Sequence, residues 1–296
     1  MELTFLGTSC MVPTKDRNQP AQLLTHKGEN ILIDCGEATQ RQMKILGIKP
    51  SRITRILITH WHGDHVLGLP GLIQTIAASD YEGTLRIYGP EHTAEKVRAM
   101  NDIFKFEERI RIEAVDVEDG IVAETDTLII SALPMRHRIR CLAYRIEEKD
   151  RRRINMSKMK KLGMEDGPHL GRLQRGESVE WKGKAVAPDD ITYIVKGKKA
   201  AFVFDTLPCK NAVEIARDAD LLVCEAVYAN DLEEKAAEYK HLTSTQAAQI
   251  ASSAGVKKLI LTHISQRYKV PDEILHDARD VFPDTEVAHD FFKVKI

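Results

Sequence analysis

Residues Thr59-His60-Trp61-His62-Gly63-Asp64-His65 directly follow a short apolar run, Ile56–Ile58. Histidine and carboxylate side chains are usual zinc ligands, and a glycine among them lets the backbone turn, so this cluster favours a metal site over a structural role. His60 and His62 can reach one ion, while Asp64 and His65 can turn towards a second. Two adjacent metal ions can stabilise both the attacking and the leaving oxygen of a hydrolysis reaction. The spacing therefore predicts a binuclear site at a strand end, completed by distant ligands.

Three more ligand-type residues lie where a loop is expected after an apolar run: His137, Asp205 and His263. Polar residues are common after strands, because loops are polar. The carboxyl ends of strands are also where α/β sheets place their active sites. These three residues are therefore candidates to complete the metal site.

Short apolar runs alternate with helical patterns along most of the chain, which predicts an α/β fold. The expected strands are Leu3–Leu6, Ile31–Asp34, Ile56–Thr59, Leu85–Tyr88, Leu128–Ala132, Leu142–Ile146, Ile191–Val195, Ala200–Phe204, Asp220–Cys224, Lys258–Leu261 and Val287–Val294. The expected helices are Ala38–Leu46, Leu69–Ala78, Glu91–Asp102, Cys209–Asp218, Thr243–Ala254 and Asp272–Val281. Hydroxyl side chains between His241 and Gln246 are candidates to cap the helix there.

A segment of different character, residues 147–188, separates two parts of similar strand–helix pattern. Its basic residues include Lys149, Arg151, Arg152, Arg153, Lys158, Lys160 and Lys161, and its turn-forming residues include Gly163, Gly167, Pro168, Gly171 and Gly176. The segment has no clear strand period, so we expect an arm inserted into a single domain of residues 1–296. A plain solvated loop is the alternative, because runs of charge are usually just solvated.

The composition is that of a globular protein rather than a basic nucleic-acid coat. The 296 residues have a formal net charge of −1, so any contact with nucleic acid must come from a local basic patch. The five cysteines form no CxxC pair, which argues against a disulfide framework. We find neither a membrane-spanning apolar run nor a secretory signal and expect a cytoplasmic protein.

The stretch from His60 to His65 resembles the HxHxDH motif of the metallo-β-lactamase superfamily. Other segments resemble the ribonuclease Z family within it: Phe5–Ser9, Pro13–Asn18, His65–Gln74, the spacing of His137 and Tyr144, Gly167-Pro168 with Gly171, Glu225–Tyr228, His241 with Ser244-Thr245, and Thr262–Tyr268. The chain departs from the family at Phe204 and Leu207, where a Gly-Asp-Thr-Arg-Pro run is usual. It also has two extra residues after His241.

The resemblance implies a four-layer αββα sandwich with a protruding arm. It implies one zinc ion on His60, His62 and His137, and a second on Asp64, His65 and His263. Asp205 would bridge the two ions. The same ligand types accept Mn²⁺ or Fe²⁺, so the metal is not fixed by the sequence.

The resemblance also implies an endoribonuclease that removes the 3′ trailer of precursor tRNA, working as a homodimer in which the arm of one subunit serves the site of the other. As a mechanistic hypothesis, Asp64 accepts a proton from the attacking water, His241 donates one to the leaving oxygen, and Glu225 orients His241. The expected contacts to RNA are Arg17, Arg267, Lys158, Lys160 and Lys161 on phosphates, with Gly167, Pro168 and Gly171 where the arm backbone approaches.

Two other functions stay open at this point. HxHxDH alone is compatible with a hydrolase of a small phosphodiester, a thioester, a lactam or an arylsulfate. A scaffold or RNA-binding protein that kept the fold without catalysis is a second alternative, although all seven ligand-type residues are present. A β-CASP-type nuclease fits less well, because no further domain is inserted before His263.

Overall fold

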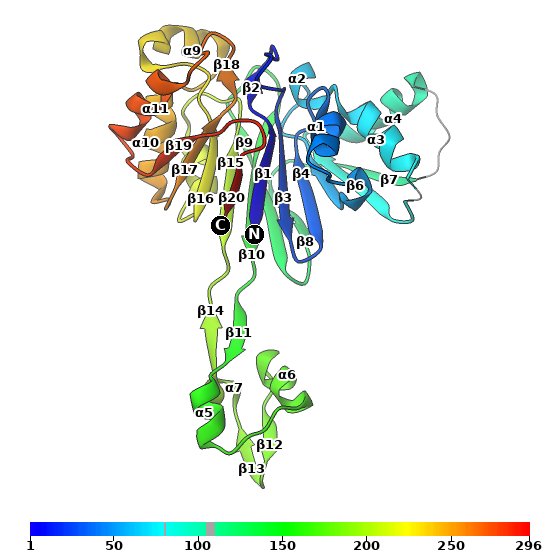
Figure 1. The fold of residues 1–296 in the computed structure, drawn as a ribbon, viewed down its shortest axis with the longest axis vertical. Coiled ribbons are helices and arrows are strands. Elements are labelled where there is room, and N and C mark those ends of the chain that lie inside the picture. Colours follow the sequence, from blue (N-terminus) through cyan, green and yellow to red (C-terminus); the bar gives the residue numbers. More distant parts are fainter. Residues whose placement is uncertain (80, 105–109) are drawn as a thin grey trace.

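Two mixed β-sheets form the centre of the molecule (Figure 1). The computed structural model describes residues 1–79, 81–104 and 110–296, and in these residues each sheet has seven strands. The first sheet has the order β20 (Lys293–Lys295), β1 (Glu2–Gly7), β3 (Ala21–His26), β4 (Glu29–Ile33), β5 (Arg55–Leu57), β6 (Thr84–Gly89) and β7 (Arg111–Asp116). The second has the order β19 (Thr285–Val287), β17 (Leu259–Thr262), β16 (Leu221–Glu225), β15 (Lys199–Val203), β10 (Cys141–Glu148), β9 (Leu128–Met135) and β8 (Gly120–Glu124).

Most central strands are buried on both faces, which explains their continuous apolar sequences. Successive side chains of a strand point to opposite faces. In β4, for example, Ile31 and Ile33 face the second sheet, whereas Leu32 faces the helices outside. The core between the sheets also contains the large side chains of Phe5, Tyr144 and Phe202. One apolar layer therefore joins the sheets, and a second and a third lie outside them.

Helices cover the outer face of each sheet. Those on the first sheet are α1 (Thr39–Ile45), α3 (Leu69–Ala77) and α4 (Thr93–Ile103), and those on the second are α8 (Lys210–Ala216), α10 (Ser244–Ala254) and α11 (Asp272–Arg279). The Thr243 side chain accepts a hydrogen bond from Gln246 N and caps α10, as expected. The result is the four-layer αββα sandwich that the sequence resemblance implied.

Short elements complete the end of the sandwich where the parallel strands finish. They are α2 (Gly63–Val66), η2 (Asn230–Leu232), α9 (Glu233–Tyr239) and the small pair β2 (Ser9–Cys10) and β18 (Ile264–Ser265), while η1 (Pro50–Arg52) precedes β5. Figure 1 shows α2, β2, β18 and α9 together at the top of the molecule.

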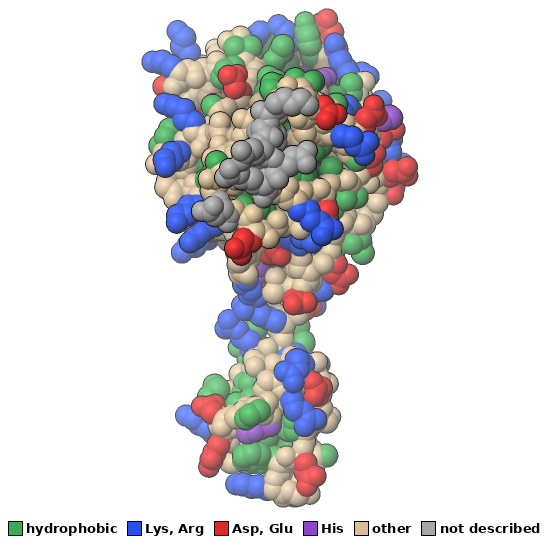
Figure 2. Space-filling model, turned by 90° about the vertical axis from the view of Figure 1, so that its right-hand side faces the viewer, with side chains coloured by type: hydrophobic (Ala, Val, Ile, Leu, Met, Phe, Trp, Pro, Cys, Tyr) green, Lys and Arg blue, Asp and Glu red, His purple; other side chains and the backbone are tan. Residues whose placement is uncertain are grey.

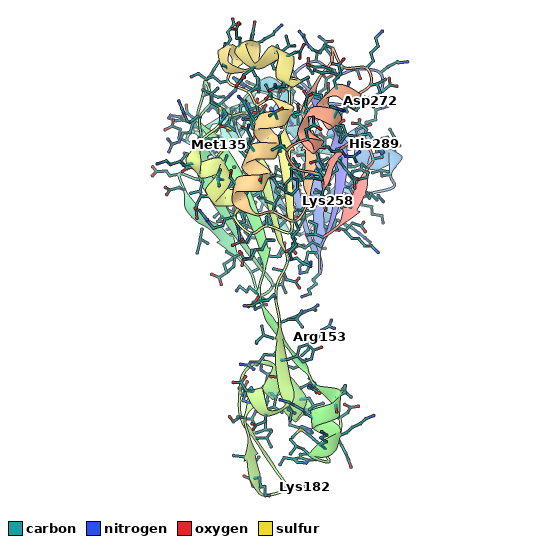
Figure 3. All side chains as sticks on the ribbon, turned by 90° about the vertical axis from the view of Figure 1, so that its left-hand side faces the viewer. Met135, Arg153, Lys182, Lys258, Asp272 and His289 are labelled. Carbon is teal, nitrogen blue, oxygen red and sulfur yellow. The ribbon has the colours of Figure 1, made fainter. Side chains whose placement is uncertain are left out.

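The arm leaves the opposite end of the sandwich, between β10 and β15 (Figure 1). Its stalk is an antiparallel pair, β11 (Arg151–Ile154) and β14 (Thr192–Val195). Its head contains α5 (Met156–Lys161), α6 (Pro168–Gln174), β12 (Val179–Trp181), β13 (Lys184–Val186) and α7 (Pro188–Ile191). The head has an apolar cluster of its own, which includes Met159, Leu173 and Ile191. Lys182 lies at the tip and Arg153 on the stalk (Figure 3).

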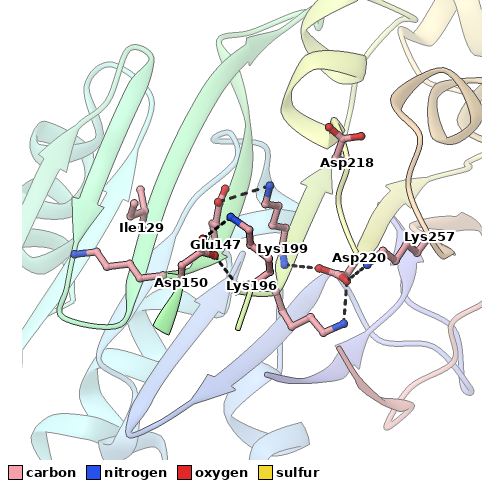
Figure 4. A pocket seen from close by; sticks show the side chains of 11 residues that line it. Ile129, Glu147, Asp150, Lys196, Lys199, Asp218, Asp220 and Lys257 are labelled. Atoms are coloured by element: carbon pink, nitrogen blue, oxygen red, sulfur yellow. Dashed lines mark hydrogen bonds and ion pairs between the residues drawn. The ribbon is translucent and has the colours of Figure 1, made fainter. Parts of the chain in front are cut away.

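Ion pairs surround a pocket of about 460 Å³ at the base of the arm (Figure 4). Asp150 accepts hydrogen bonds from Lys196 Nζ at 2.7 Å and Gly197 N at 2.9 Å. Asp220 accepts from Lys198 Nζ at 2.9 Å and Lys257 Nζ at 2.8 Å. Lys and Arg side chains gather where the stalk joins the sandwich (Figure 2). Charge at this end of the molecule is therefore exposed and largely paired.

One sequence expectation was wrong. Residues 287–294 do not form one strand, because β19 ends at Val287 and pairs with β17, whereas β20 begins at Lys293 and pairs with β1. Asp290, in the loop between them, accepts hydrogen bonds from Thr8, Asn18 and Gln42. Ala288 N donates to Leu261 O of β17 and Phe291 N donates to Phe5 O of β1, so the loop crosses from one sheet to the other.

A strand was expected over residues 191–195, and residues 192–195 do form β14, with Ile191 at the end of α7; β14 pairs with β11 of the arm rather than with the central sheet. The other elements of the arm and the strands β2, β3, β7, β8 and β18 were not expected from the sequence. In the part of the chain that the structure describes, no helix has the length and apolar character needed to span a membrane.

Candidate metal centre and active site

The seven ligand-type residues meet at the end of the sandwich opposite the arm. Asp34, His60, Asp205, Glu225 and His263 all lie at or just after the carboxyl end of a strand. Three of them have left-handed backbone geometry, with φ of 56° at Asp34, 38° at Asp205 and 57° at His263. Such geometry costs energy in residues other than glycine and tends to occur at functional sites. The turns direct these side chains towards one another between the two sheets.

One group of possible ligands contains His60, His62, His137 and Asp205. His60 Nε2 lies 2.9 Å from His62 Nδ1 and 3.5 Å from Asp205 Oδ2. His137 Nε2 lies 3.3 Å from His62 Nδ1 and 3.8 Å from the same Asp205 oxygen. Four nitrogen and oxygen atoms therefore surround one small space, as a four-coordinate zinc site requires.

A second group contains Asp64, His65 and His263. His65 Nε2 and His263 Nε2 lie 3.5 Å and 3.4 Å from Asp64 Oδ2. The other oxygen of Asp205, Oδ1, is 3.5 Å from His65 Nε2 and 3.3 Å from His263 Nδ1. Asp205 therefore presents one oxygen to each group. The structure thus brings together the residues that the resemblance implied for each ion, and it places Glu225 and His241 within ligand distance of Asp205 and His263 as well.

Several buried polar atoms of these groups lack a hydrogen-bond partner within the described residues. They are His65 Nε2, Asp205 Oδ1 and His263 Nδ1, and the three side chains are at most 3% exposed. Buried polar atoms are rarely left unsatisfied in native proteins. Their convergence from both sheets fits the binding of cations by this donor set.

The protonation of the site also suits cation binding. Burial lowers the pKa of His60, His62 and His137, so these rings are neutral, the form that donates a lone pair. Burial alone would lower the pKa of His65, but the carboxylates of Asp34, Asp205 and Asp64 outweigh it and raise that pKa to about 9. A bound cation would take the place of such protons against the carboxylates.

Asp34 is a functional residue that the sequence analysis missed. Its side chain is fully buried and accepts hydrogen bonds from Thr59 N and Thr59 Oγ1, both at 2.8 Å. Asp34 Oδ2 also lies 2.7 Å from His65 Nδ1, which fixes the ring with its Nε2 facing Asp64 and Asp205. Carboxylates behind histidine ligands commonly have this role. The available signal was its position after an apolar run, the criterion that selected Asp205.

The helix that carries Asp64 and His65 is held closely against the loop after β4. Cys35 N donates to His65 O at 2.8 Å, and Gly68 N donates to Cys35 O at 3.0 Å. A Cβ atom on Gly68 would lie 2.0 Å from Gly36 O, so this approach requires glycine. Met11 N of the N-terminal loop donates to Asp64 Oδ2 at 3.0 Å. These contacts fix the second ligand group from both sides.

His241 and Glu225 form a hydrogen-bonded pair beside the two ligand groups. His241 Nδ1 lies 2.8 Å from Glu225 Oε2 and 3.7 Å from Asp205 Oδ2. Glu225 is fully buried, and its Oε1 accepts a hydrogen bond from Thr206 N at 2.6 Å. Burial opposes protonation of His241, but the Glu225 and Asp205 carboxylates outweigh it and raise the pKa of His241. The arrangement leaves Nε2 of His241 as the atom available to a substrate.

The two departures from the family pattern at Asp205 have clear places in the structure. Phe204 is buried in the core between the sheets, and its ring centroid lies 6.5 Å from that of His65 and 6.4 Å from that of His263. Leu207 N donates to Arg136 O at 2.9 Å, which ties the Asp205 loop to the loop of His137. Neither substitution displaces a ligand-type residue.

The residues expected to bind RNA lie in three places. Arg17 is half-buried and donates to Tyr268 O, so it joins the N-terminal loop to the loop after β18. Arg267 is exposed on the loop that follows His263, with its guanidinium 5.5 Å from the ring centroid of Tyr228. The remaining expected contacts lie in the arm: Lys158, Lys160, Lys161, Gly167, Pro168 and Gly171.

Comparisons with known proteins agree with this geometry. Ribonuclease Z of Methanothermobacter thermautotrophicus is 43% identical over 297 residues, with 100% of this chain and 97% of that protein covered. Human tRNase Z, short form, has a TM-score of 0.74 at 26% identity, with 100% and 99% of the two chains covered. The metallo-β-lactamase fold protein YhfI from Bacillus subtilis has a TM-score of 0.71 at 19% identity, with 99% and 98% covered, which is a likeness of fold. A family model described as anti-Pycsar protein Apyc1 matches residues 1–101 alone.

Proposed function

Because the chain belongs to the ribonuclease Z family, we propose that it is a metal-dependent endoribonuclease that removes the 3′ trailer of precursor tRNA by hydrolysing one phosphodiester bond. The observation that carries the proposal is the position of Asp205 between two groups of possible ligands, with one carboxylate oxygen near each group. The substrate class, precursor tRNA, is inferred from the similarity to ribonuclease Z relatives along the whole chain. A cytoplasmic location is part of the proposal, because precursor tRNA would be met there.

Two divalent cations, zinc in the first instance, would bind between the sheets. His60, His62 and His137 would hold one, Asp64, His65 and His263 the other, and Asp205 both. Cations in such a pair lower the pKa of bound water and offset negative charge that develops on phosphoryl oxygens. The unpartnered atoms of His65, Asp205 and His263 support this assignment.

The chain itself would supply orientation and proton transfer. Asp64 is tied to Met11 N through one oxygen and can accept a proton from the attacking water. His241, held at Nδ1 by Glu225, can donate from Nε2 to the leaving oxygen. General acid–base groups of this kind contribute roughly 10²–10⁴-fold to a rate. Glu225 acts through His241 and is a positioning residue.

The arm would bind the body of the tRNA away from the site of hydrolysis. Lys158, Lys160 and Lys161 are exposed on α5 and can contact phosphates without reading sequence. A Cβ atom on Gly171 would meet only the end of the Arg175 side chain, at 3.6 Å, so the packing of the arm itself does not require glycine there. Close approach of RNA would explain it.

We also propose a homodimer in which the arm of one subunit serves the site of the other. The arm lies at one end of the molecule and α2, which carries Asp64 and His65, lies at the other (Figure 1), so the basic head is far from its own catalytic centre. A second copy in a closed, symmetric dimer would bring a head to each centre. Sedimentation of the purified protein tests this part.

The deciding experiment is incubation of the purified protein with a 3′-extended precursor tRNA. We expect one cut near the end of the acceptor stem, and none with His65→Ala, which loses a ligand. His241→Ala should reduce kcat on precursor tRNA and on a small phosphodiester alike. A protein that hydrolyses the small phosphodiester but leaves precursor tRNA intact would overturn the proposed substrate.

A further inference from the structure

A row of alternating cations and aromatic rings runs along one rim of the active site. It contains five residues, here called the α9 rim: Arg267, Tyr228, Lys235, Tyr239 and Arg138. The Arg267 guanidinium lies 5.5 Å from the Tyr228 ring centroid, and Lys235 Nζ lies 5.9 Å from the same centroid. Lys235 Nζ is also 6.0 Å from the Tyr239 centroid, which has the Arg138 guanidinium at 5.3 Å. The row therefore links the loop of His263 to the loop of His137.

Hydrogen bonds fix the α9 rim to the catalytic residues. His137 Nδ1 lies 3.0 Å from Lys240 O, and Arg138 Nη2 donates to Glu238 O at 2.9 Å. His241 N donates to Ala236 O at 2.9 Å, so the histidine directly follows the helix that carries Lys235 and Tyr239. A strand of substrate on this surface would be held at a defined distance from the atoms where hydrolysis occurs.

The charges of the rim are available to a ligand. Arg138 and Arg267 are exposed, Lys235 is half-buried, and Tyr239 is 41% exposed. Over residues 1–79, 81–104 and 110–296, the ion pairs of the structure include none of Arg138, Lys235 and Arg267. Cation–π contacts at exposed sites are weak, about 0.5–1 kcal/mol, so the rings leave the cations free to bind phosphate.

We propose that the α9 rim binds the unpaired nucleotides that flank the scissile phosphate. Tyr239 would stack on a base, and Arg138, Lys235 and Arg267 would contact the backbone phosphates. Aromatic rings that alternate with cations are the usual means of holding a single strand without reading its sequence. α9 also carries Glu233, Glu234 and Glu238. Their carboxylates repel phosphates, so they disfavour a duplex, which has two phosphate backbones, more than a single strand whose base can stack. This inference rests on the proposed ribonuclease function.

The test compares Tyr239→Ala, Tyr239→Phe and Lys235→Ala on a precursor tRNA with an unpaired trailer and on a small phosphodiester. We expect Tyr239→Ala to raise KM for the precursor by roughly 5- to 150-fold, the range of one lost stack, well beyond any change for the small substrate. Tyr239→Phe keeps the aromatic ring, so its KM for the precursor should be about that of the wild type. Lys235→Ala should weaken the salt dependence of binding by about one phosphate contact.

Lys295→Ala is the matched control, because this exposed lysine lies on β20, at the end of the sandwich opposite the site. It should match the wild type on both substrates. An equal KM for the precursor in Tyr239→Ala and the wild type would overturn the inference, as would an equal rise in Tyr239→Phe and Tyr239→Ala. If the wild type itself leaves precursor tRNA uncut, the proposed function fails instead. Binding of a labelled single-stranded oligoribonucleotide then tests the rim alone, and equal affinity in wild type and Tyr239→Ala would overturn it.

Discussion

The two ends of the sandwich hold their charged residues in opposite ways. At the site end, the side chains of Asp34, His60 and Asp205 are at most 3% exposed and lie within hydrogen-bonding networks or ligand groups. At the arm end, Lys196 and Lys257 are 84% and 72% exposed and pair with Asp150, which is 44% exposed, and Asp220, which is 10% exposed. Buried charges are costly unless they are paired or bind a metal, whereas exposed pairs contribute little to stability.

This difference indicates a division of work. Buried ligands at strand ends are positioned to a fraction of an ångström by backbone that cannot move independently, as hydrolysis requires. The arm has a small core of its own and a two-stranded stalk, so it can present many cations without constraining them. Variants at one end should therefore affect chemistry, and variants at the other should affect capture of the substrate.

The largest effect is expected from Asp205→Ala, which removes the residue shared by both ligand groups. Both precursor tRNA and a small phosphodiester should go uncleaved, and the zinc content measured by elemental analysis should fall. Asp126→Ala, at an exposed turn between β8 and β9, is the control and should behave as the wild type. Full zinc content with normal rates in Asp205→Ala would contradict the assigned site.

Replacement of residues 151–195 by Asn-Gly should separate the two ends. The short loop should be able to connect β10 to β15, because the ends of these strands are adjacent: Glu148 N donates to Lys198 O at 2.8 Å, and Glu147 pairs with Lys199 in the sheet. Loss of a second binding region should reduce kcat/KM for precursor tRNA by roughly 10²–10⁴-fold. Hydrolysis of the small phosphodiester should persist. Equal losses on the two substrates, measured side by side, would mean that the arm has a structural role.

Asp34→Asn should have an intermediate effect at the site end. The new amide would keep an acceptor for Thr59 N but would present a donor to His65 Nδ1, where the carboxylate now accepts. Loss of such a supporting carboxylate costs roughly 10- to 100-fold in metal affinity or activity. Competition with a chelator measures the affinity. Unchanged zinc binding would show that His65 is held by its backbone alone.

The smallest effect is expected at the arm end, from Asp220→Asn. Burial opposes ionisation of Asp220, but hydrogen bonds from Lys257, Lys198 and the backbone outweigh it and lower its pKa. A lowered folded pKa stabilises the protein above the ordinary carboxyl pKa, and this contribution is lost as the pH falls through the acidic range. The Tm of the variant should be about 2 °C below that of the wild type at pH 7, and this difference in Tm should shrink below pH 4. A difference that grows in acid would contradict this.

The ligand residues could be predicted because each has a local signal. His60, His62, Asp64 and His65 are consecutive ligand types, and Asp205 follows a strongly apolar strand. Asp34 has the same local signal but no partner close in sequence, and its role depends on contact with His65, 31 residues away. The hydrogen bond between His241 and Glu225 was expected only through the family resemblance. Contacts across the sheets are not visible in local patterns.

The fold was predictable where strands are buried on both faces. β7 and β8 lie at sheet edges and are largely exposed or half-buried, so their sequences lack a continuous apolar run. The core of the arm is assembled from residues separated by turns, such as Met159 and Val186, which gives no periodic pattern. Residues 287–294 have the sequence pattern of one strand. The hydrogen bonds that hold Asp290 in a loop come from Thr8, Asn18 and Gln42, which are far away in the sequence, so the local pattern does not reveal the interruption.

The joint between arm and sandwich has an evolutionary consequence. Both stalk strands leave the second sheet at neighbouring positions, beyond the pairing of Glu147 with Lys199. Insertions, deletions or a wholesale exchange of the segment between them can therefore accumulate without disturbing either buried layer. Proteins of this architecture can therefore gain, change or lose an RNA-binding arm as a single inserted segment, while the residues of the hydrolytic centre stay the same.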